Sequence, residues 1–359
     1  MMKRILIAIL FIQATIIGFS QDTIAHQEED QLLNTLVTDG QVIGISAGYT
    51  VNGEVQWMNN RGYQDLEKKI PFSDTTLTRI ASIAKPMTAI AVMQLVEKGL
   101  IDLDAPIQNY LLDFPMSKKG NITVRHLLSH TSGIDVYKNV KEAETQVNYA
   151  SLDDAVDVFQ KRKLKFEPGT SFFYTTYGYV VLGNIIEKVS GLTFEEYMQQ
   201  NIWDRADMKN TGVEKFNSEY ENKSRLYHFE KGATSIGVRN NLSNRIPGGG
   251  FYSTLEDLFK FGNGVLEHTF ISEETFKMVT EIHSIEKEGN PYGFGWFLYG
   301  QNPNENSVIG HSGEQTGCAA QLMIIPGSKT VVVVLSNTSG KWREIIGYSA
   351  QLIRCSSKL

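Results

Sequence analysis

The sequence predicts an α/β (α+β) fold in which both ends of the chain build one antiparallel sheet and the middle forms a mainly helical second lobe. Strand-like runs occur in 42–60 and again in 293–336. Between them, 152–267 shows mainly helical periodicity broken by loops. Strands at the two ends with helices between them imply a shared sheet with a helical insertion.

The same patterns predict a simple domain organisation. We expect a signal peptide over 1–20 and one catalytic domain over 21–359. Within that domain, the α/β lobe takes about 26–81 and 290–359, and the helical lobe takes about 82–289. Clefts between such lobes are where small-molecule sites usually lie.

The first twenty residues have the layout of a cleavable secretory signal. Lys3 and Arg4 precede an apolar run over 5–19, and Gly18 and Ser20 are the small residues before a cut after residue 20. A membrane anchor is the alternative, but a run of fifteen residues with polar interruptions falls short of the roughly twenty that span a bilayer. We expect an exported protein, periplasmic or secreted, with no stable membrane span after cleavage.

Composition excludes several classes of function. A chain of 359 residues with 42% hydrophobic and 21% charged residues is an ordinary globular protein. The net charge is −6, and −8 without Lys3 and Arg4, which disfavours nucleic acid as a partner. Two cysteines, Cys318 and Cys355, allow at most one disulfide, and the sequence leaves their pairing open. The match of 357–359 to a peroxisomal address is interpreted as chance beside a secretory signal.

The N-terminal part predicts a helix over 26–38 and then a hairpin within 42–60. The hairpin turns at Asn52-Gly53, since both central residues of a type I′ turn need positive φ. Ser46 stands in a G-x-S-x-G pattern, which in a nucleophile elbow requires a strand, a sharp turn and a helix. Here the strand continues into the hairpin, so we interpret Ser46 as a half-buried strand residue.

The next segment places a hydroxyl and an amine where a helix begins. Apolar residues over 89–96 have helical spacing, and Gly99 supplies the stop. Pro86 is tolerated only in the first turn, so Ser82 lies near the helix N-terminus and shares a face with Lys85. The unpaired amides and positive dipole end there favour developing negative charge, such as an alkoxide or oxyanion.

His126 and His130 stand four residues apart, a spacing that two metal ligands on one helical face share. The metalloprotease pattern needs Glu after the first His, and Leu127 stands there. Because no third ligand is evident, we favour histidines that hydrogen-bond within a loop beside the site. We expect no metal ion and no cofactor.

The remaining segments complete the expected architecture. A helix is predicted over 180–190, and 247–254 predicts a backbone bend before a helix capped by Thr254. The C-terminal strands turn at the Pro-Gly pair 326–327, and a closing helix follows over 341–353. That helix is expected to bury four apolar side chains, Trp342, Ile345, Ile346 and Ile353.

Three motifs then occur in a characteristic order. The first is Ser-x-x-Lys over 82–85, the second is Tyr174 with Thr176, and the third is His-Ser-Gly over 311–313. Together they resemble the serine β-lactamase and penicillin-binding protein superfamily, in particular its class C-like branch of esterases, D-alanyl peptidases and β-lactamase-related hydrolases. The resemblance covers about 42–353.

The resemblance implies roles for these residues. Ser82 would attack an acyl carbonyl and form an ester. Lys85 and Tyr174 would share the role of base, because a lysine near a tyrosine favours phenolate and desolvation lowers the lysine pKa. His311 would face the cleft, orienting substrate or assisting proton transfer. The oxyanion hole is expected from the backbone amides of Ser82 and Glu314.

Substrate choice depends on the neighbouring positions. Ser312, beside Gly313 in the third motif, would supply a hydroxyl for a substrate carboxylate. Thr176 stands where the family most often has Asn, so it lacks the amide donor that orients an amide of the substrate, although its hydroxyl can accept a bond from Lys85. We therefore expect weak or absent β-lactam turnover.

The sequence thus predicts a metal-independent serine hydrolase that cleaves a small ester or a D-amino-acid peptide through a Ser82 acyl-enzyme. Its substrates are expected to be small molecules or peptides of the peptidoglycan type, esters or β-lactams. The alternative is a non-catalytic or slowly turning over penicillin-binding sensor or scaffold, suggested by the altered second motif. The oligomeric state is left open.

Overall fold

The structure is a computed structural model that describes residues 26–284, 291–299 and 307–358. The expected signal segment over 1–20 and the final residue lie outside the described residues. Within the described ranges, no helix combines the length and apolar character needed to cross a membrane.

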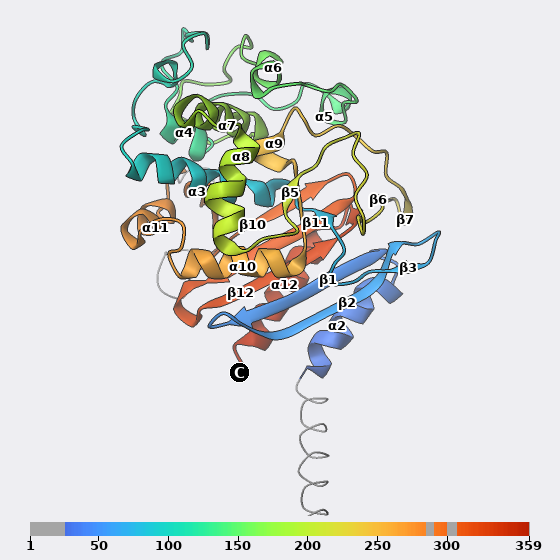
Figure 1. Cartoon of the computed structure of the whole chain (residues 1–359). Helices are drawn as coiled ribbons and strands as arrows, with labels where there is room; N and C mark the ends of the chain where they lie inside the picture. Colours follow the sequence, from blue (N-terminus) through green and yellow to red (C-terminus); the bar gives the residue numbers. More distant parts are fainter. Residues whose placement is uncertain (1–25, 285–290, 300–306, 359) are drawn as a thin grey trace, which may run out of the picture.

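A seven-stranded sheet joins the two ends of the chain (Figure 1). Its order is β3-β2-β1-β12-β11-β10-β9, and all neighbours pair antiparallel. The N-terminal and C-terminal strands meet at β1 and β12, where Ile45 lies opposite Ser336. The predicted fold class is confirmed. The strands are β1 (Gly44–Val51), β2 (Glu54–Asp65), β3 (Ile70–Pro71), β9 (Phe297–Tyr299), β10 (Val308–Gln315), β11 (Cys318–Ile325) and β12 (Thr330–Ser336).

The hairpin between β1 and β2 forms as the sequence predicts. Asn52 and Gly53 have φ values of 52° and 82°, which a type I′ turn requires. Ser46 lies inside β1, opposite Asn60 of β2, and the strand continues past it. The G-x-S-x-G pattern therefore forms no nucleophile elbow.

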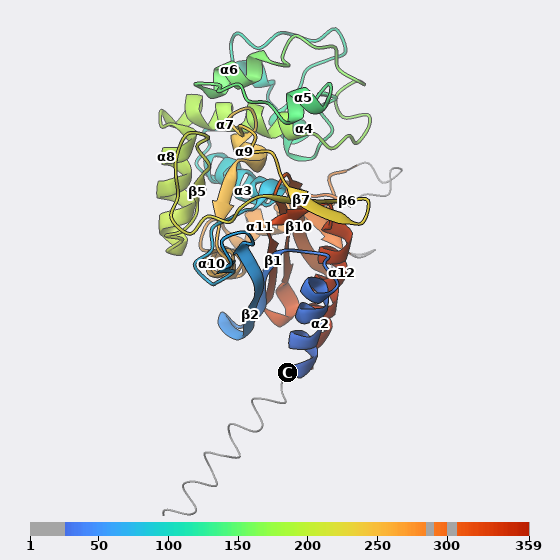
Figure 2. The same cartoon turned by 90° about the vertical axis from the view of Figure 1, so that its right-hand side faces the viewer.

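One face of the sheet is covered by α2 (Gln27–Thr38) and α12 (Trp342–Ser356), as Figures 1 and 2 show. Leu33 and Ile345 are fully buried in this layer. The expectation that Trp342 is buried is wrong, because its side chain is 42% exposed. Trp342 is the first residue of α12, and its ring lies 5.3 Å from the Arg343 guanidinium instead of under the sheet. Ile346 and Ile353 are half-buried against the same layer.

The opposite face is covered by α10 (Leu255–Leu266), which Thr254 caps as predicted. Gly262 of α10 lies so close to β12 that an added Cβ would be 2.5 Å from Val331 Cγ1. Part of the stretch 82–289 therefore belongs to the sheet layer and not to the helical lobe. Because helices cover both faces, β1 and β12 are buried on both sides.

The two cysteines are free and buried. Cys318 begins β11 and Cys355 lies in the last turn of α12. Burial raises the pKa of the Cys318 thiol, so this group stays protonated and packs as a small apolar side chain.

The helical lobe is built around α3 (Ala84–Glu97). Its residues from Ala84 to Leu95 are all buried, as in a helix that is surrounded on every side. The other helices of this lobe are α4 (Val124–Leu128), α5 (Val140–Ala143), α6 (Leu152–Asp157), α7 (Thr176–Ser190), α8 (Phe194–Met198), α9 (Ile246–Gly249) and α11 (Glu273–Val279). Short helical turns are η1 (Ala81–Ile83), η2 (Ile107–Asn109), η3 (Gln199–Trp203), η4 (Asp204–Ala206) and η6 (Pro326–Ser328).

Two small three-stranded sheets accompany the lobes. Their orders are β4-β8-β5 and β13-β6-β7. The first carries the strand that leads to Ser82. The strands are β4 (Thr78–Arg79), β5 (Gly212–Val213), β6 (Tyr227–Glu230), β7 (Ala233–Ile236), β8 (Phe251–Ser253) and β13 (Thr338–Ser339).

The position of α2 on the sheet leads to a test of the fold. Leu33→Ala is expected to lower the free energy of unfolding by about 2–5 kcal/mol, because it leaves a cavity in a closed apolar layer. Urea unfolding followed by circular dichroism measures the change. The matched control is Leu32→Ala, whose wild-type side chain is only half-buried. An equal loss in both variants would contradict the packing of α2.

Candidate active site

Ser82 lies in the turn that joins β4 to α3. Ala81, directly before it, has a φ of 46°, a left-handed conformation that residues with a side chain rarely adopt. Pro86 is the third residue of α3, where no intrahelical partner for an amide is lost. The predicted helix start is confirmed, and the Ser82 side chain is half-buried there.

Lys85 is fully buried one turn after the nucleophile candidate. Its Nζ lies 2.9 Å from Ser82 Oγ, 3.3 Å from Thr176 Oγ1 and 2.7 Å from the carbonyl oxygen of Gly248. Burial lowers the pKa of the Lys85 amine well below its usual value, and the charge of Arg245 lowers this pKa further. The amine is therefore held toward its neutral form.

These three contacts match the hydrogen-bonding capacity of a neutral amine, which has two hydrogens and one lone pair. The Gly248 carbonyl can only accept, so it takes one hydrogen. The Thr176 hydroxyl can accept the other. The lone pair of Lys85 is then left for the Ser82 hydroxyl. In this arrangement Lys85 can remove the proton from Ser82 as it attacks.

Thr176 is the first residue of α7, and the hydroxyl of Thr175 caps the helix. The Thr176 hydroxyl contacts Lys85 Nζ at 3.3 Å. Its methyl group packs on Gly248, where an added Cβ would lie 2.6 Å from Thr176 Cγ2. A hydroxyl thus occupies the place beside the base that an amide would otherwise fill.

Tyr174 stands beside the Ser82–Lys85 pair. Lys85 Nζ lies 4.9 Å from the Tyr174 ring centroid. Burial raises the pKa of Tyr174 above its usual value, although the nearby Ser82 hydroxyl acts to lower this pKa. The expectation of a phenolate is therefore wrong, because a neutral Lys85 supplies no charge that would stabilise one. Tyr174 is a phenol that can pass a proton on.

His311 lies beside Tyr174 in β10, with 1% of its surface exposed. Its Nδ1 donates to the carbonyl oxygen of Ser312 at 2.6 Å, because a carbonyl only accepts. Its Nε2 then accepts from the Tyr292 hydroxyl at 3.1 Å. Burial lowers the pKa of His311 to about 3. This neutral ring supports Tyr174 at a centroid distance of 6.0 Å and has no hydrogen bond to Ser82 among the described residues.

Strand β10 approaches the nucleophile turn at Gly313, where an added Cβ would be 2.3 Å from the Ile80 carbonyl oxygen. A two-residue turn joins β10 to β11, so Gln315 and Cys318 form the hydrogen-bonded pair that closes the hairpin. Along an antiparallel ladder, hydrogen-bonded pairs alternate with pairs that exchange no backbone hydrogen bonds. Glu314, one residue earlier, therefore points its amide away from β11. Beyond Gly310 the described part of β9 no longer pairs with β10, so this amide faces an open strand edge. That orientation fits the expected oxyanion donor.

Ser312, the remaining residue of the third motif, and the side chain of Glu314 lie at the same open edge of β10. Ser312 is half-exposed. The Glu314 carboxylate accepts from the Gly340 amide at 2.6 Å. Glu314 thus ties the end of β10 to the segment before α12 through its side chain, while its backbone amide stays on the site.

With this geometry in place, the chain can be compared with known proteins. The model of the family described as Beta-lactamase matches residues 30–352. The chain belongs to the Beta-lactamase family. As a member, it is a serine hydrolase related to penicillin-binding proteins, as the motifs predicted.

Relatives of this Beta-lactamase-family chain are distant in sequence but extensive in coverage. Serine beta-lactamase-like protein LACTB, mitochondrial, from Homo sapiens is 27% identical, over 84% of this chain and 72% of that protein. Penicillin-binding protein 4* from Bacillus subtilis is 27% identical, over 79% of this chain and 66% of that protein. The solved penicillin-binding protein from Bacillus halodurans is 27% identical, with a TM-score of 0.77 and coverage of 89% and 98% of the two chains.

The two histidines considered as metal ligands support loops of this Beta-lactamase-family site. His126 Nδ1 accepts from the Thr123 amide at 3.2 Å within a capping box at the start of α4. His130 lies past the end of α4 and its Nδ1 accepts from the Thr175 amide at 3.3 Å. The His130 ring also lies 4.3 Å from the Tyr174 ring, centroid to centroid. Among the residues that the structure describes, no group of three His, Cys, Asp or Glu could hold a metal ion.

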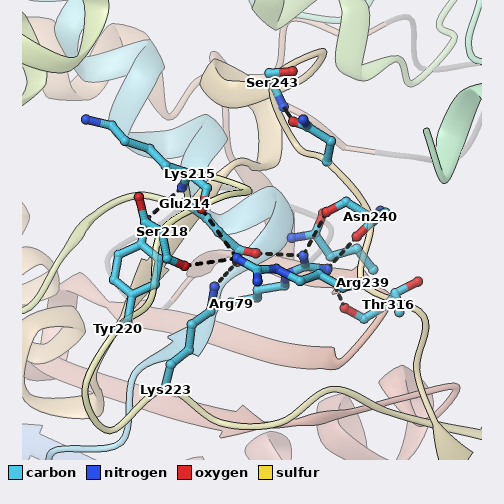
Figure 3. Close-up of polar contacts among 12 residues, drawn as sticks. Arg79, Glu214, Lys215, Ser218, Tyr220, Lys223, Arg239, Asn240, Ser243 and Thr316 are labelled. Atoms are coloured by element: carbon cyan, nitrogen blue, oxygen red, sulfur yellow. Dashed lines mark hydrogen bonds and ion pairs between the residues drawn. The ribbon is translucent and has the colours of Figure 1, made fainter. Parts of the chain in front are cut away.

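A buried ion cluster three residues before Ser82 was missed by sequence reasoning (Figure 3). Arg79 is fully buried and binds both carboxylate oxygens of Glu214, at 2.8 and 2.7 Å. Lys223 adds a second cation at 2.7 Å, and the two cations lower the pKa of Glu214 to about 2. Nothing marks this pair in the sequence, since its members are 135 residues apart.

The same guanidinium links the two halves of the site. Arg79 Nη1 donates to Asn240 Oδ1 at 2.7 Å and to the carbonyl oxygen of Thr316 at 2.9 Å (Figure 3). Thr316 follows β10 directly, so Arg79 connects the strand before the nucleophile with the strand that carries Glu314. We assign Arg79 as a positioning residue, since its contacts are with protein groups.

The charge of Arg245 leads to a test of the Lys85 assignment. Lys85 must be neutral to accept a proton, so kcat/KM should fall as the pH drops through the pKa of Lys85, at a pH well below 10.5. Arg245→Gln removes a charge that lowers this pKa. The fall in kcat/KM on the acidic side of the pH profile, its acidic limb, should therefore move to higher pH. The measurement is the pH profile of kcat/KM for an activated ester.

Arg245→Lys is the matched control, because it keeps the charge and should leave the limb in place. Thermal unfolding of both variants checks the loss of the Arg245 hydrogen bond to the Ala143 carbonyl. An acidic limb near the pKa of free lysine, or equal profiles for the two variants, would contradict the assignment.

Proposed function

We propose that this protein is an exported hydrolase that transfers the acyl group of a small ester or a D-amino-acid peptide to Ser82 and then to water. The observation that carries the proposal is the buried Lys85 amine, 2.9 Å from the Ser82 hydroxyl. A buried amine next to a serine is an activated nucleophile pair, and strongly shifted pKa values are typical of functional sites.

The first step forms the acyl-enzyme. Ser82 Oγ attacks the carbonyl carbon while its proton moves to Lys85 Nζ, and the carbonyl oxygen becomes an oxyanion. The amides of Ser82 and Glu314 would stabilise this oxyanion. The proton on Lys85 then passes to the leaving alcohol or amine, with the Tyr174 phenol as the relay, and the bond to the leaving group breaks.

The second step releases the acyl group. Water attacks the ester carbon, its proton moves to Lys85 by the same route, and the oxyanion again lies between the two amides. Collapse returns the proton to Ser82 Oγ and frees the carboxylic acid. The enzyme is therefore restored without a cofactor.

The substrate class follows from the groups beside the nucleophile. Thr176 offers a hydroxyl and no amide, so an acylamino side chain of a β-lactam finds no side-chain amide donor at that position. Ser312, half-exposed on the open edge of β10, would bind a terminal carboxylate of a D-amino-acid peptide. Export is supported by the layout of 1–20.

Labelling tests the nucleophile. A fluorophosphonate probe is expected to modify Ser82, and peptide mass spectrometry should find the added mass on the peptide that contains 82–85. Ser82→Ala should abolish labelling and ester hydrolysis. Ser46→Ala is the matched control, because this serine lies in β1 with 2% of its surface exposed. An active Ser82→Ala variant would refute the proposal.

Turnover distinguishes this function from the sensor alternative. A burst followed by steady ester hydrolysis supports a hydrolase, whereas a stable adduct without turnover supports a penicillin-binding sensor. The altered second motif favours neither outcome alone, because Thr176 retains a contact with Lys85.

The hydroxyl of Thr176 has its own test. Thr176→Val keeps the shape of the side chain but removes the acceptor for Lys85, so kcat on an ester should fall about 3–10-fold, as for a lost neutral hydrogen bond. Thr176→Asn supplies an amide and should raise the rate of acylation by a cephalosporin relative to the ester. Efficient wild-type hydrolysis of penicillins or cephalosporins, unchanged in Thr176→Asn, would contradict this account of substrate choice.

A further inference from the structure

A pocket lies in the helical lobe, away from the proposed catalytic residues. Its volume is about 380 Å³, and it is formed by the loop around 114–119 and by the segment 159–164 that follows α6. Apolar side chains make its walls, including Phe114, Ile122, Ile134, Phe159 and Leu164. None of the proposed catalytic residues lines it. Figures 1 and 2 place α6 at the end of the molecule farthest from the seven-stranded sheet.

The rim of this pocket is strongly basic in an acidic protein. Segments 112–119 and 159–165 together carry six cationic side chains and one acidic one, although the net charge of the chain is −6. Two of the cations have carboxylate partners, Arg162 with Glu142 and Lys165 with Asp135. The other four are exposed and make no ion pair within the described ranges, namely Lys118, Lys119, Lys161 and Lys163.

Two large apolar side chains project from the same rim. Leu112 is 86% exposed and Met116 is 73% exposed. Met116 also lines the pocket, and Leu112 lies two residues before the pocket residue Phe114. Single exposed apolar residues are common, but two on one loop beside unpaired lysines form a surface with both an apolar and a cationic component.

We propose that this surface, made of Leu112, Met116 and the four unpaired lysines, docks the protein on a bilayer that contains anionic phospholipids. Leu112 and Met116 would enter the interfacial layer, where apolar side chains gain burial without crossing the bilayer. The lysines would bind phosphate groups, and the pocket would receive the first carbons of an acyl chain.

Charge complementarity decides between occupants. A soluble polyanion would pair with the lysines but would leave Leu112 and Met116 in water. A neutral protein surface would bury the two apolar side chains. It would leave the positive charges of the lysines uncompensated, and these charges repel one another. An anionic bilayer satisfies both components at once, and the acidic remainder of the chain keeps the rest of the molecule off that bilayer.

Vesicle flotation with the full chain tests this proposal. Binding is expected to vesicles of phosphatidylglycerol with phosphatidylcholine, and to be weak for phosphatidylcholine alone and at high salt. Lys161→Glu/Lys163→Glu should lower the partition coefficient at least about tenfold. Leu112→Ser/Met116→Ser should lower it as well, since it removes the apolar component. All variants keep the same N-terminal segment, so differences between them report on this surface.

Lys68→Glu/Lys69→Glu is the matched control. These lysines are exposed between β2 and β3 beside the half-exposed Leu66 and Ile70, so the control makes the same charge change on the sheet side of the molecule. It should bind vesicles like the wild type.

Equal binding by all variants would overturn the proposal. Loss in the lysine variant with no loss in Leu112→Ser/Met116→Ser would also overturn it and indicate a soluble polyanion. Ester hydrolysis without vesicles should be unchanged in every variant, which separates this surface from the active site.

Discussion

The desolvated amine of Lys85 is the constraint on which the rest of this structure depends. A charged amine buried without a counter-ion is strongly disfavoured, so the site stabilises the neutral form. No carboxylate contacts Nζ in the described structure, where its hydrogen-bond partners are two hydroxyls and a carbonyl. This choice of partners makes Lys85 a base and not half of an ion pair.

The groups around Lys85 share this neutral character. Tyr174 remains a phenol and His311 an unprotonated imidazole, both because of burial. The site therefore has few charged side chains that would interact with the oxyanion. During the reaction, the proton is the one charge that has to move between its groups. Arg245 is the exception close to the base, and its charge acts on Lys85 in the direction that catalysis needs.

The parts of the site come from segments that are far apart in the chain and meet through close backbone contacts. Gly313 and Gly248 permit two of these contacts, against the Ile80 carbonyl and the Thr176 methyl. Arg79, in the strand before Ser82, adds a buried cation that binds the turn after β10. Because a buried charge is costly to leave unpaired, this cluster favours one relative placement of the two strands over alternatives.

The sequence by itself determined the elements and the nucleophile pair, because helix starts, type I′ turns and Ser-x-x-Lys spacing are local. Pro86 and the Asn52-Gly53 pair each dictate a backbone conformation within a few residues. Only the tertiary structure decided how the side chains act. The neutral state of Lys85, the buried position of His311 and the Arg79–Glu214 pair depend on desolvation and on partners distant in sequence, which no local pattern specifies.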